Sequence, residues 1–181
     1  MTRERLWCGQ RVKVVDDTGV SMPDTARNQR AFPQPSNQKK GCGFPVAKLV
    51  GSFCLASGAL LHWAEGTLHV HESKLFRKLF AFFLPGDIIL TDRGLCSYVH
   101  IALLLRAGLD TLMRLPQARP SDLRKGKRLG PNDRLVTWQK PKQRPRGCTV
   151  ADWRRVPDTL TLRWFMSRSA CPVSEPSLSS W

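Results

Sequence analysis

The sequence has few acidic residues for its basic ones, and it has no long apolar run. Lysine and arginine number 29 against 14 aspartates and glutamates, which gives a net charge of +15. A chain this basic is suited to a polyanion, because each phosphate that it neutralises releases a counterion. No apolar run approaches the roughly 20 residues of a membrane span, and no secretory signal opens the chain. We therefore expect a cytoplasmic protein with a nucleic-acid partner.

The cysteines also lack a pattern. The sequence contains no CxxC pair and no histidine at zinc-finger spacing, so neither a structural zinc site nor a disulfide framework is expected. This scatter fits a reducing cytoplasm. The six positions are Cys8, Cys42, Cys54, Cys96, Cys148 and Cys171.

Short apolar runs separated by turn residues predict alternating strands and helices. The β-branched run Val12–Val15 predicts a strand that ends at Asp16, and the polar stretch 20–43 predicts a long loop. Further elements are expected at 44–56 and 59–65 (a hairpin), 73–84 (an amphipathic helix), 87–91 (a buried strand), 97–107 (a helix capped by Ser97 and stopped by Gly108) and 110–115 (a strand). This order predicts an α/β fold with a mixed sheet flanked by helices.

Two aspartates follow the expected strands. The strands before Asp16 and Asp92 are joined by a long connection that contains a helix, so they can lie parallel and adjacent. Their carboxylates then share one edge of the sheet, where they could bind Mg²⁺, which prefers oxygen ligands. An aspartate after a strand is also a common turn former or helix cap, and on spacing alone that interpretation is favoured.

The basic charge is concentrated in the second half. Residues 116–168 hold 14 lysines and arginines against four aspartates, whereas residues 1–115 hold 15 against nine acidic residues. Strands are expected at 134–139 and 159–163, between basic turns. From about Trp164 the pattern dissolves into serine, proline and cysteine.

Three longer motifs occur in a fixed order: VKVVDDTGVSMPDT, then GDIILTDRGLCSY, then RLGPNDRLVTWQKP. Together they resemble transposases of the DDE class, in particular the branch typified by insertion sequence four. The likeness runs from about Trp7 to about Arg163. It implies an incomplete RNase H-like catalytic core at 1–115 and a β-rich basic insertion segment at 116–163. Residues 164–181 are then expected to be a disordered or out-of-frame tail.

The resemblance also assigns roles to the aspartates. It implies that Asp16 and Asp92 are catalytic ligands of Mg²⁺ or Mn²⁺. Asp17 is the alternative for the first position. We favour Asp16, because Thr18 stays in register with Asp16. The family's third carboxylate lies in a Tyr-x₂-Arg-x₃-Glu-x₆-Lys pattern, and the one glutamate after Asp92 is Glu175, outside such a pattern. We therefore expect a truncated transposase that is inactive by itself.

The implied partner is double-stranded DNA at transposon ends and targets, bound by a homodimer at the bacterial nucleoid. Two other functions stay open: a non-catalytic DNA-binding relic, and an RNase H-like nuclease that uses two aspartates. Trp63, Trp138 and Trp153 could stack on bases, although packing in the core or on a sheet is the favoured interpretation. The candidate DNA contacts are Lys39, Lys40, Arg93, Arg124, Lys125, Lys127 and Arg128.

Overall fold

A computed structural model describes residues 6–39, 41–116, 126–145 and 147–166. Its internal contacts divide the chain into two units. The first consists of residues 1–120 and 140–158, and the second of residues 121–139 and 159–181. Residues 140–158, which the resemblance to DDE transposases assigns to the insertion segment, therefore belong to the first unit.

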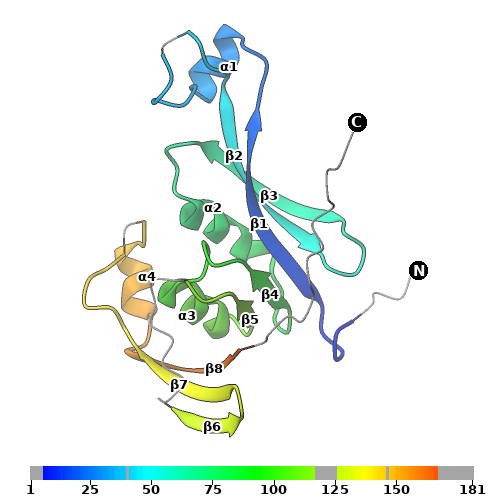
Figure 1. Cartoon of the computed structure of the whole chain (residues 1–181), viewed down its shortest axis with the longest axis vertical. Helices are drawn as coiled ribbons and strands as arrows, with labels where there is room; N and C mark the ends of the chain where they lie inside the picture. The colour runs from blue at the N-terminus through cyan, green and yellow to red at the C-terminus, as the bar shows by residue number, and fades with distance from the viewer. Residues whose placement is uncertain (1–5, 40, 117–125, 146, 167–181) are drawn as a thin grey trace, which may run out of the picture. The chain divides into compact units, whose positions relative to one another are not determined.

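A five-stranded mixed sheet forms the first unit, with the strand order β3-β2-β1-β4-β5 (Figure 1). β1 pairs in antiparallel fashion with β2, which pairs in the same way with β3, while β4 is parallel to both β1 and β5. This is the sheet of an RNase H-like fold, and it confirms the expected fold class. The strands are β1 (Val12–Ser21), β2 (Val46–Cys54), β3 (Leu60–Thr67), β4 (Ile88–Thr91) and β5 (Asp110–Met113).

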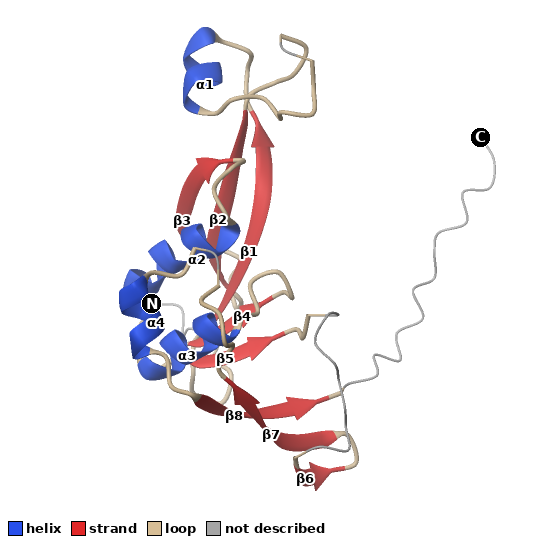
Figure 2. Ribbon diagram, turned by 90° about the vertical axis from the view of Figure 1, so that its left-hand side faces the viewer, coloured by secondary structure: helices blue, strands red, loops and turns tan. Residues whose placement is uncertain are grey.

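Two helices cover one face of this sheet (Figure 2). α2 (Glu72–Leu79) continues into the 3₁₀ turn η1 (Phe80–Phe82), and α3 (Tyr98–Arg106) connects β4 to β5. The Ser97 hydroxyl accepts a hydrogen bond from the His100 amide, which confirms the expected N-cap of α3. In the described part of the chain, no helix is long and apolar enough to cross a membrane.

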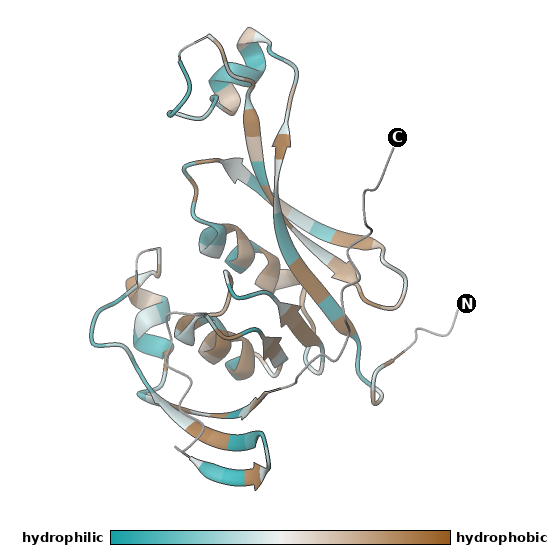
Figure 3. Cartoon of the chain, viewed as in Figure 1, coloured by the Kyte–Doolittle hydropathy of each residue, from teal (hydrophilic) through white to brown (hydrophobic). Residues whose placement is uncertain are grey.

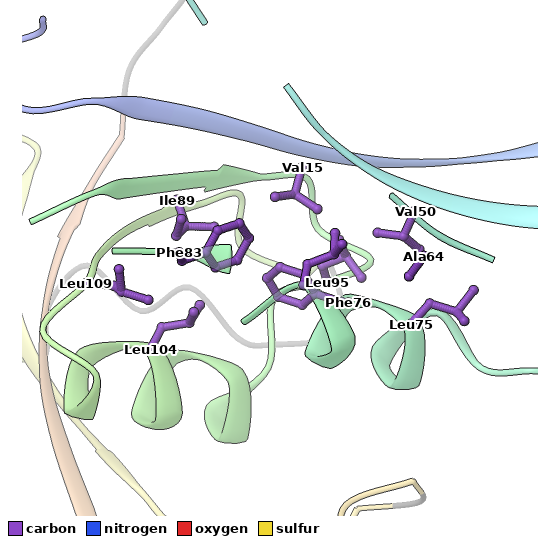
Figure 4. Close-up of a cluster of buried hydrophobic side chains, with 11 residues drawn as sticks. Val15, Val50, Ala64, Leu75, Phe76, Phe83, Ile89, Leu95, Leu104 and Leu109 are labelled. Carbon is purple, nitrogen blue, oxygen red and sulfur yellow. The ribbon is translucent and has the colours of Figure 1, made fainter. Parts of the chain in front are cut away.

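The hydrophobic core lies between the sheet and these helices (Figure 4). The apolar stripe predicted for 73–84 is buried there, and α3 and β4 are the strongly hydrophobic elements of Figure 3. The core consists of Val15, Val50, Ala64, Leu75, Phe76, Leu79, Phe83, Ile89, Leu95, Leu104 and Leu109. Val15 directly precedes Asp16 on β1 and is part of this core. The packing of Val15 therefore fixes the part of β1 that carries the candidate site.

A buried ion pair joins β1 to the start of β4. The Asp87 carboxylate is fully buried and lies 2.8 Å from the Lys13 ammonium and 2.8 Å from Nε of Arg11. Burial alone would raise the pKa of Asp87, but hydrogen bonds from Lys13, the Leu84 amide and Arg11 outweigh it and lower the pKa. The pair therefore stays charged and holds β1 against β4.

The second unit is an antiparallel sheet of β6 (Lys127–Gly130), β7 (Asp133–Gln139) and β8 (Thr159–Phe165). β7 and β8 confirm the strands expected in this region. Arg163 on β8 forms an ion pair with Asp133 on β7 at 2.5 Å, across directly neighbouring strands. β8 also takes in the first two residues of the predicted tail, and residues 167–181 lie outside the described part.

Four elements differ from the sequence expectations, and one of them is β6, a strand that no sequence pattern predicts. β1 does not end at Asp16 but continues to Ser21, because its second half pairs with β2 down to Val46. The expected long loop contains a short polar helix, α1 (Ala26–Ala31), at the end of this β1–β2 ribbon (Figure 1). α4 (Val150–Arg155), which no sequence pattern predicts, begins at a Thr149 N-cap.

Candidate active site

The register of the parallel pair β1–β4 brings the two predicted aspartates together. Val15 pairs with Thr91, the last residue of β4, so the next residues along the two chains are Asp16 and Asp92. Neighbouring strands lie about 4.8 Å apart, so these two residues start from adjacent backbone positions. The expectation of adjacent, parallel strands is confirmed, although Asp16 lies within β1 rather than at its end.

Asp92 is held by the turn that follows β4. Its Oδ1 accepts hydrogen bonds from the Gly94 amide at 2.9 Å and from the Leu95 amide at 3.3 Å. A Cβ at position 94 would lie 3.3 Å from Oδ1 of Asp92, so glycine lets the turn close around the carboxylate. The side chain is exposed, and the turn fixes its direction while leaving it accessible to a ligand.

Asp16 and Asp17 point to opposite faces of the sheet, as successive residues of a strand do. Asp17 pairs with Val50, a core residue, and therefore lies on the face that the helices cover. Asp16 pairs with Gly51 on the other face and is exposed. We call this second face, which α2 and α3 do not cover, the outer face.

A glutamate that no sequence motif singles out lies beside Asp92 and, together with partial burial, raises the pKa of Asp17. Glu72 is the first residue of α2, and its Oε1 accepts a hydrogen bond from Lys48 at 3.0 Å. A Cβ on Gly94 would lie 3.7 Å from Oε2 of Glu72, so Glu72 and Asp92 flank the same glycine. The family's pattern directs the search for a third carboxylate to residues after Asp92, whereas the packing of α2 brings a glutamate from before it close to Asp92.

The electrostatics of this edge of the sheet are strongly negative. The pKa of Asp17 is raised, first by its partial burial and then by the negative charges of Glu72, Asp16 and Asp92; Lys48 opposes the shift. Carboxylates that repel one another in this way are stabilised by a nearby cation. The negative charge therefore favours cation binding at the carboxyl end of β4.

The chemistry of these side chains fits a hard divalent cation such as Mg²⁺, because every candidate donor is a carboxylate oxygen. These carboxylates do not, however, converge on one point. Within residues 6–39, 41–116, 126–145 and 147–166, no three His, Cys, Asp or Glu side chains form a group that could hold a metal ion. Asp16 and Asp92 would thus supply two ligands, and water or a DNA phosphate would supply the others.

The predicted DNA contacts are spread over separate elements. Lys39 is exposed in the loop after α1, and β1 runs five residues, roughly 17 Å, from Asp16 before that loop region begins. The β1–β2 ribbon therefore carries this loop region away from Asp16. Arg93 is half-buried beside Asp92, and Lys127 and Arg128 are exposed on β6. Lys40, Arg124 and Lys125 lie outside the described residues.

Comparison with known proteins identifies one similarity. The family model of the transposase DDE domain matches residues 7–166. This range includes both aspartates and extends past the end of β8 at Phe165, so it spans the two sheets. No curated protein and no solved structure matches the chain.

Proposed function

Since the chain belongs to the transposase DDE domain family, we propose that it acts in the metal-dependent cutting and joining of DNA at transposon ends, with Asp16 and Asp92 as the metal-binding carboxylates. Transposase function and a DNA substrate follow from the family. The two residues, the choice of Mg²⁺ or Mn²⁺, the branch typified by insertion sequence four and a homodimer on the DNA are part of the proposal.

One observation carries the assignment of residues. The pairing of Val15 with Thr91 makes Asp16 and Asp92 neighbours at the carboxyl end of β4. Both are exposed, so a phosphate can approach them, whereas the partly buried Asp17 faces Glu72 and the helices. This geometry supports Asp16 rather than Asp17 as the ligand.

The chain's own residues would hold the reacting phosphate in place. A bound divalent cation activates an attacking oxygen and stabilises the leaving oxygen in phosphoryl transfer. Asp16 and Asp92 would bind that cation, and the Gly94 and Leu95 amides keep the Asp92 carboxylate in one orientation. Arg93, next to Asp92, is suited to contact a neighbouring phosphate.

We propose further that these 181 residues do not complete the reaction alone. The family's third glutamate has no counterpart in a Tyr-x₂-Arg-x₃-Glu pattern after Asp92. Glu72 does not replace it in this proposal, because its Oε1 is engaged by Lys48. A misplacement of the reacting groups by about 1 Å can cost 10²-fold in rate. Two carboxylates are expected to bind a cation but not to hold it accurately enough for efficient catalysis.

The experiment compares duplex DNA binding with Mg²⁺ and with EDTA, at equal ionic strength. Added cations normally weaken DNA binding because they compete for phosphates. A cation bridging the aspartates and a phosphate should instead strengthen it, in the unmodified chain and in the control Asp158→Asn, which changes a side chain that is 97% exposed. Asp16→Asn and Asp92→Asn should each lose the gain. A gain that survives both substitutions would refute the assigned residues.

Incubation with supercoiled plasmid then separates the alternatives. We expect background nicking with either metal, which agrees with a chain that binds DNA and does not cut it. Metal-dependent nicking that Asp92→Asn stops would instead support the nuclease that needs two aspartates. DNA binding that never responds to Mg²⁺ would support the non-catalytic relic.

A further inference from the structure

A pocket lies at the amino end of β1, at the opposite end of that strand from α1 (Figure 1). Its volume is about 280 Å³, and neither Asp16 nor Asp92 lines it. The pocket is therefore separate from the candidate active site. The polar and aromatic residues that line it come from different elements: Arg11 just before β1, Lys13 on β1, His62 on β3 and Phe82 on η1.

Positive charge exceeds negative charge beside this pocket. Arg11 and Lys13 both pair with the single buried carboxylate of Asp87, so two positive charges face one negative charge. Both oxygens of Asp87 are already used. Its Oδ1 accepts from Nε of Arg11, and its Oδ2 accepts from the Leu84 amide and lies 2.8 Å from the Lys13 ammonium. One positive charge is therefore left over.

Arg11 is the cation that can still bind an anion. The Lys13 ammonium also donates to the Phe82 carbonyl at 3.0 Å and lies over the Phe83 ring, and Lys13 is buried. The Arg11 side chain is 41% exposed, and within the described residues only its Nε has a hydrogen-bond partner. The two terminal nitrogens of Arg11 are therefore available to donate to a ligand.

Large apolar side chains surround this charge and are left partly in water, with exposed fractions between 38% and 52%. The Phe82 ring stacks on His62, with ring centroids 4.2 Å apart and ring planes 13° apart, so this wall of the pocket is held in place without a ligand. Exposed apolar side chains around a few polar groups are typical of a binding site. The four apolar side chains are Leu6, Leu61, Phe82 and Leu84.

We propose that this pocket binds a small, ionised carboxylic acid, with its carboxylate on the terminal nitrogens of Arg11 and its apolar body against Phe82 and Leu84. A carboxylate matches the planar fork of a guanidinium and forms charge-assisted hydrogen bonds with it. The apolar body would remove the exposed side chains from water, which is favourable. Ligand pockets usually measure roughly 300–1,000 Å³, so this one suits a body of about one ring.

Three compounds test the proposal by calorimetric titration of the full chain at one pH and one ionic strength. The compound 3-phenylpropanoate has both the carboxylate and the ring, 3-phenylpropanol has the ring alone, and acetate has the carboxylate alone. Hydrogen bonds to charged groups are strong enough that the acid should bind about 10- to 150-fold more tightly than the alcohol. Acetate should bind more weakly than the acid, because it has no apolar body.

Substitutions on the two sides of the pocket separate the two contributions. Arg11→Gln should remove the preference for the acid over the alcohol, whereas Phe82→Ala should weaken both of these compounds alike. The matched controls are Arg27→Gln, at an exposed arginine of α1, and Phe44→Ala, at a phenylalanine that is 62% exposed. Both controls should bind the three compounds as the unmodified chain does.

A further measurement does not depend on the folding of a variant. Because a ligand of the folded state stabilises it, 3-phenylpropanoate should raise the Tm of the unmodified chain above the Tm in an equal concentration of acetate. Equal affinities for the acid and the alcohol, or a preference that persists in a folded Arg11→Gln, would overturn the proposal. If no compound binds and Phe82→Ala changes the sedimentation of the protein, the surface is a protein contact and the proposal is wrong. None of these outcomes changes the assignment of Asp16 and Asp92, which rests on separate measurements.

Discussion

His100 on α3 should make the fold weaken in mild acid. Its side chain is buried, with a relative exposure of 3%, and its ring packs edge-on against Phe76 with centroids 5.0 Å apart. Burial disfavours the charged imidazole and lowers the pKa of His100 from 6.5 to about 4, although its hydrogen bond with the Leu95 carbonyl, at 2.8 Å from Nδ1, opposes the shift. In the folded state the His100 imidazole therefore stays neutral between pH 6.5 and about pH 4.

The size of the effect follows from proton linkage. Between pH 6.5 and pH 4 the unfolded chain takes up a proton at this residue that the folded chain does not, so stability falls as the pH falls. A tenfold change in proton affinity is worth about 1.4 kcal/mol, so the pKa of about 4 corresponds to a loss of about 3 kcal/mol. The contribution is complete above pH 6.5 and disappears towards pH 4.

Urea unfolding at a series of pH values measures this loss. Other groups titrate in the same window, so the informative quantity is the difference between the unmodified chain and His100→Gln, which can keep a donor for Leu95 but does not take up a proton. His69→Gln, at an exposed histidine, is the matched control and should retain the full pH dependence. Parallel curves for the unmodified chain and His100→Gln would show that His100 does not cause the loss of stability in acid.

Three further outcomes are expected. Asp87→Asn leaves the buried Lys13 without its charged partner and should lower the free energy of unfolding by about 3–5 kcal/mol in urea titrations, whereas a change below about 1 kcal/mol would contradict the buried pair. If six phosphates are contacted, the slope of log K for DNA binding against log salt should be near −5. The joint change Lys127→Ala and Arg128→Ala should make this slope less steep by about 2. An unchanged slope would show that neither residue contacts the DNA. The outer face should bind a hydrophobic dye, less so in Leu60→Ser, and a sharp reversible melt above about 60 °C without dye binding would contradict an uncovered apolar face.

Much of the fold follows from local patterns. Apolar residues at helical spacing predict the helix over 73–84, and most of them are core residues: Leu75, Phe76 and Leu79 lie on α2, and Phe83 directly follows η1. α1 escapes prediction because none of its residues is buried, so it has no apolar face to detect. The second half of β1, Asp17–Ser21, has little strand propensity of its own and is extended because β2 pairs with it.

Some features of the candidate site also follow from the sequence, and others do not. The adjacency of Asp16 and Asp92 is predictable, because parallel strands joined by a helical connection bring their carboxyl ends together. The nearness of Glu72 to Asp92 is not, because it depends on how α2 packs against the sheet. The opposite faces of Asp16 and Asp17 follow from strand alternation only once the strand is known to continue past Asp16.

Titration with Mn²⁺, followed by electron paramagnetic resonance of the free ion, tests the central claim most directly. We expect weak binding by the unmodified chain, because two carboxylates leave most of about six coordination positions to water. Asp16→Asn and Asp92→Asn should each abolish binding, and Asp17→Asn should retain it. Binding that is lost in Asp17→Asn and kept in Asp16→Asn would place the cation on the helix-covered face beside Glu72 and show that Asp16 is not the ligand.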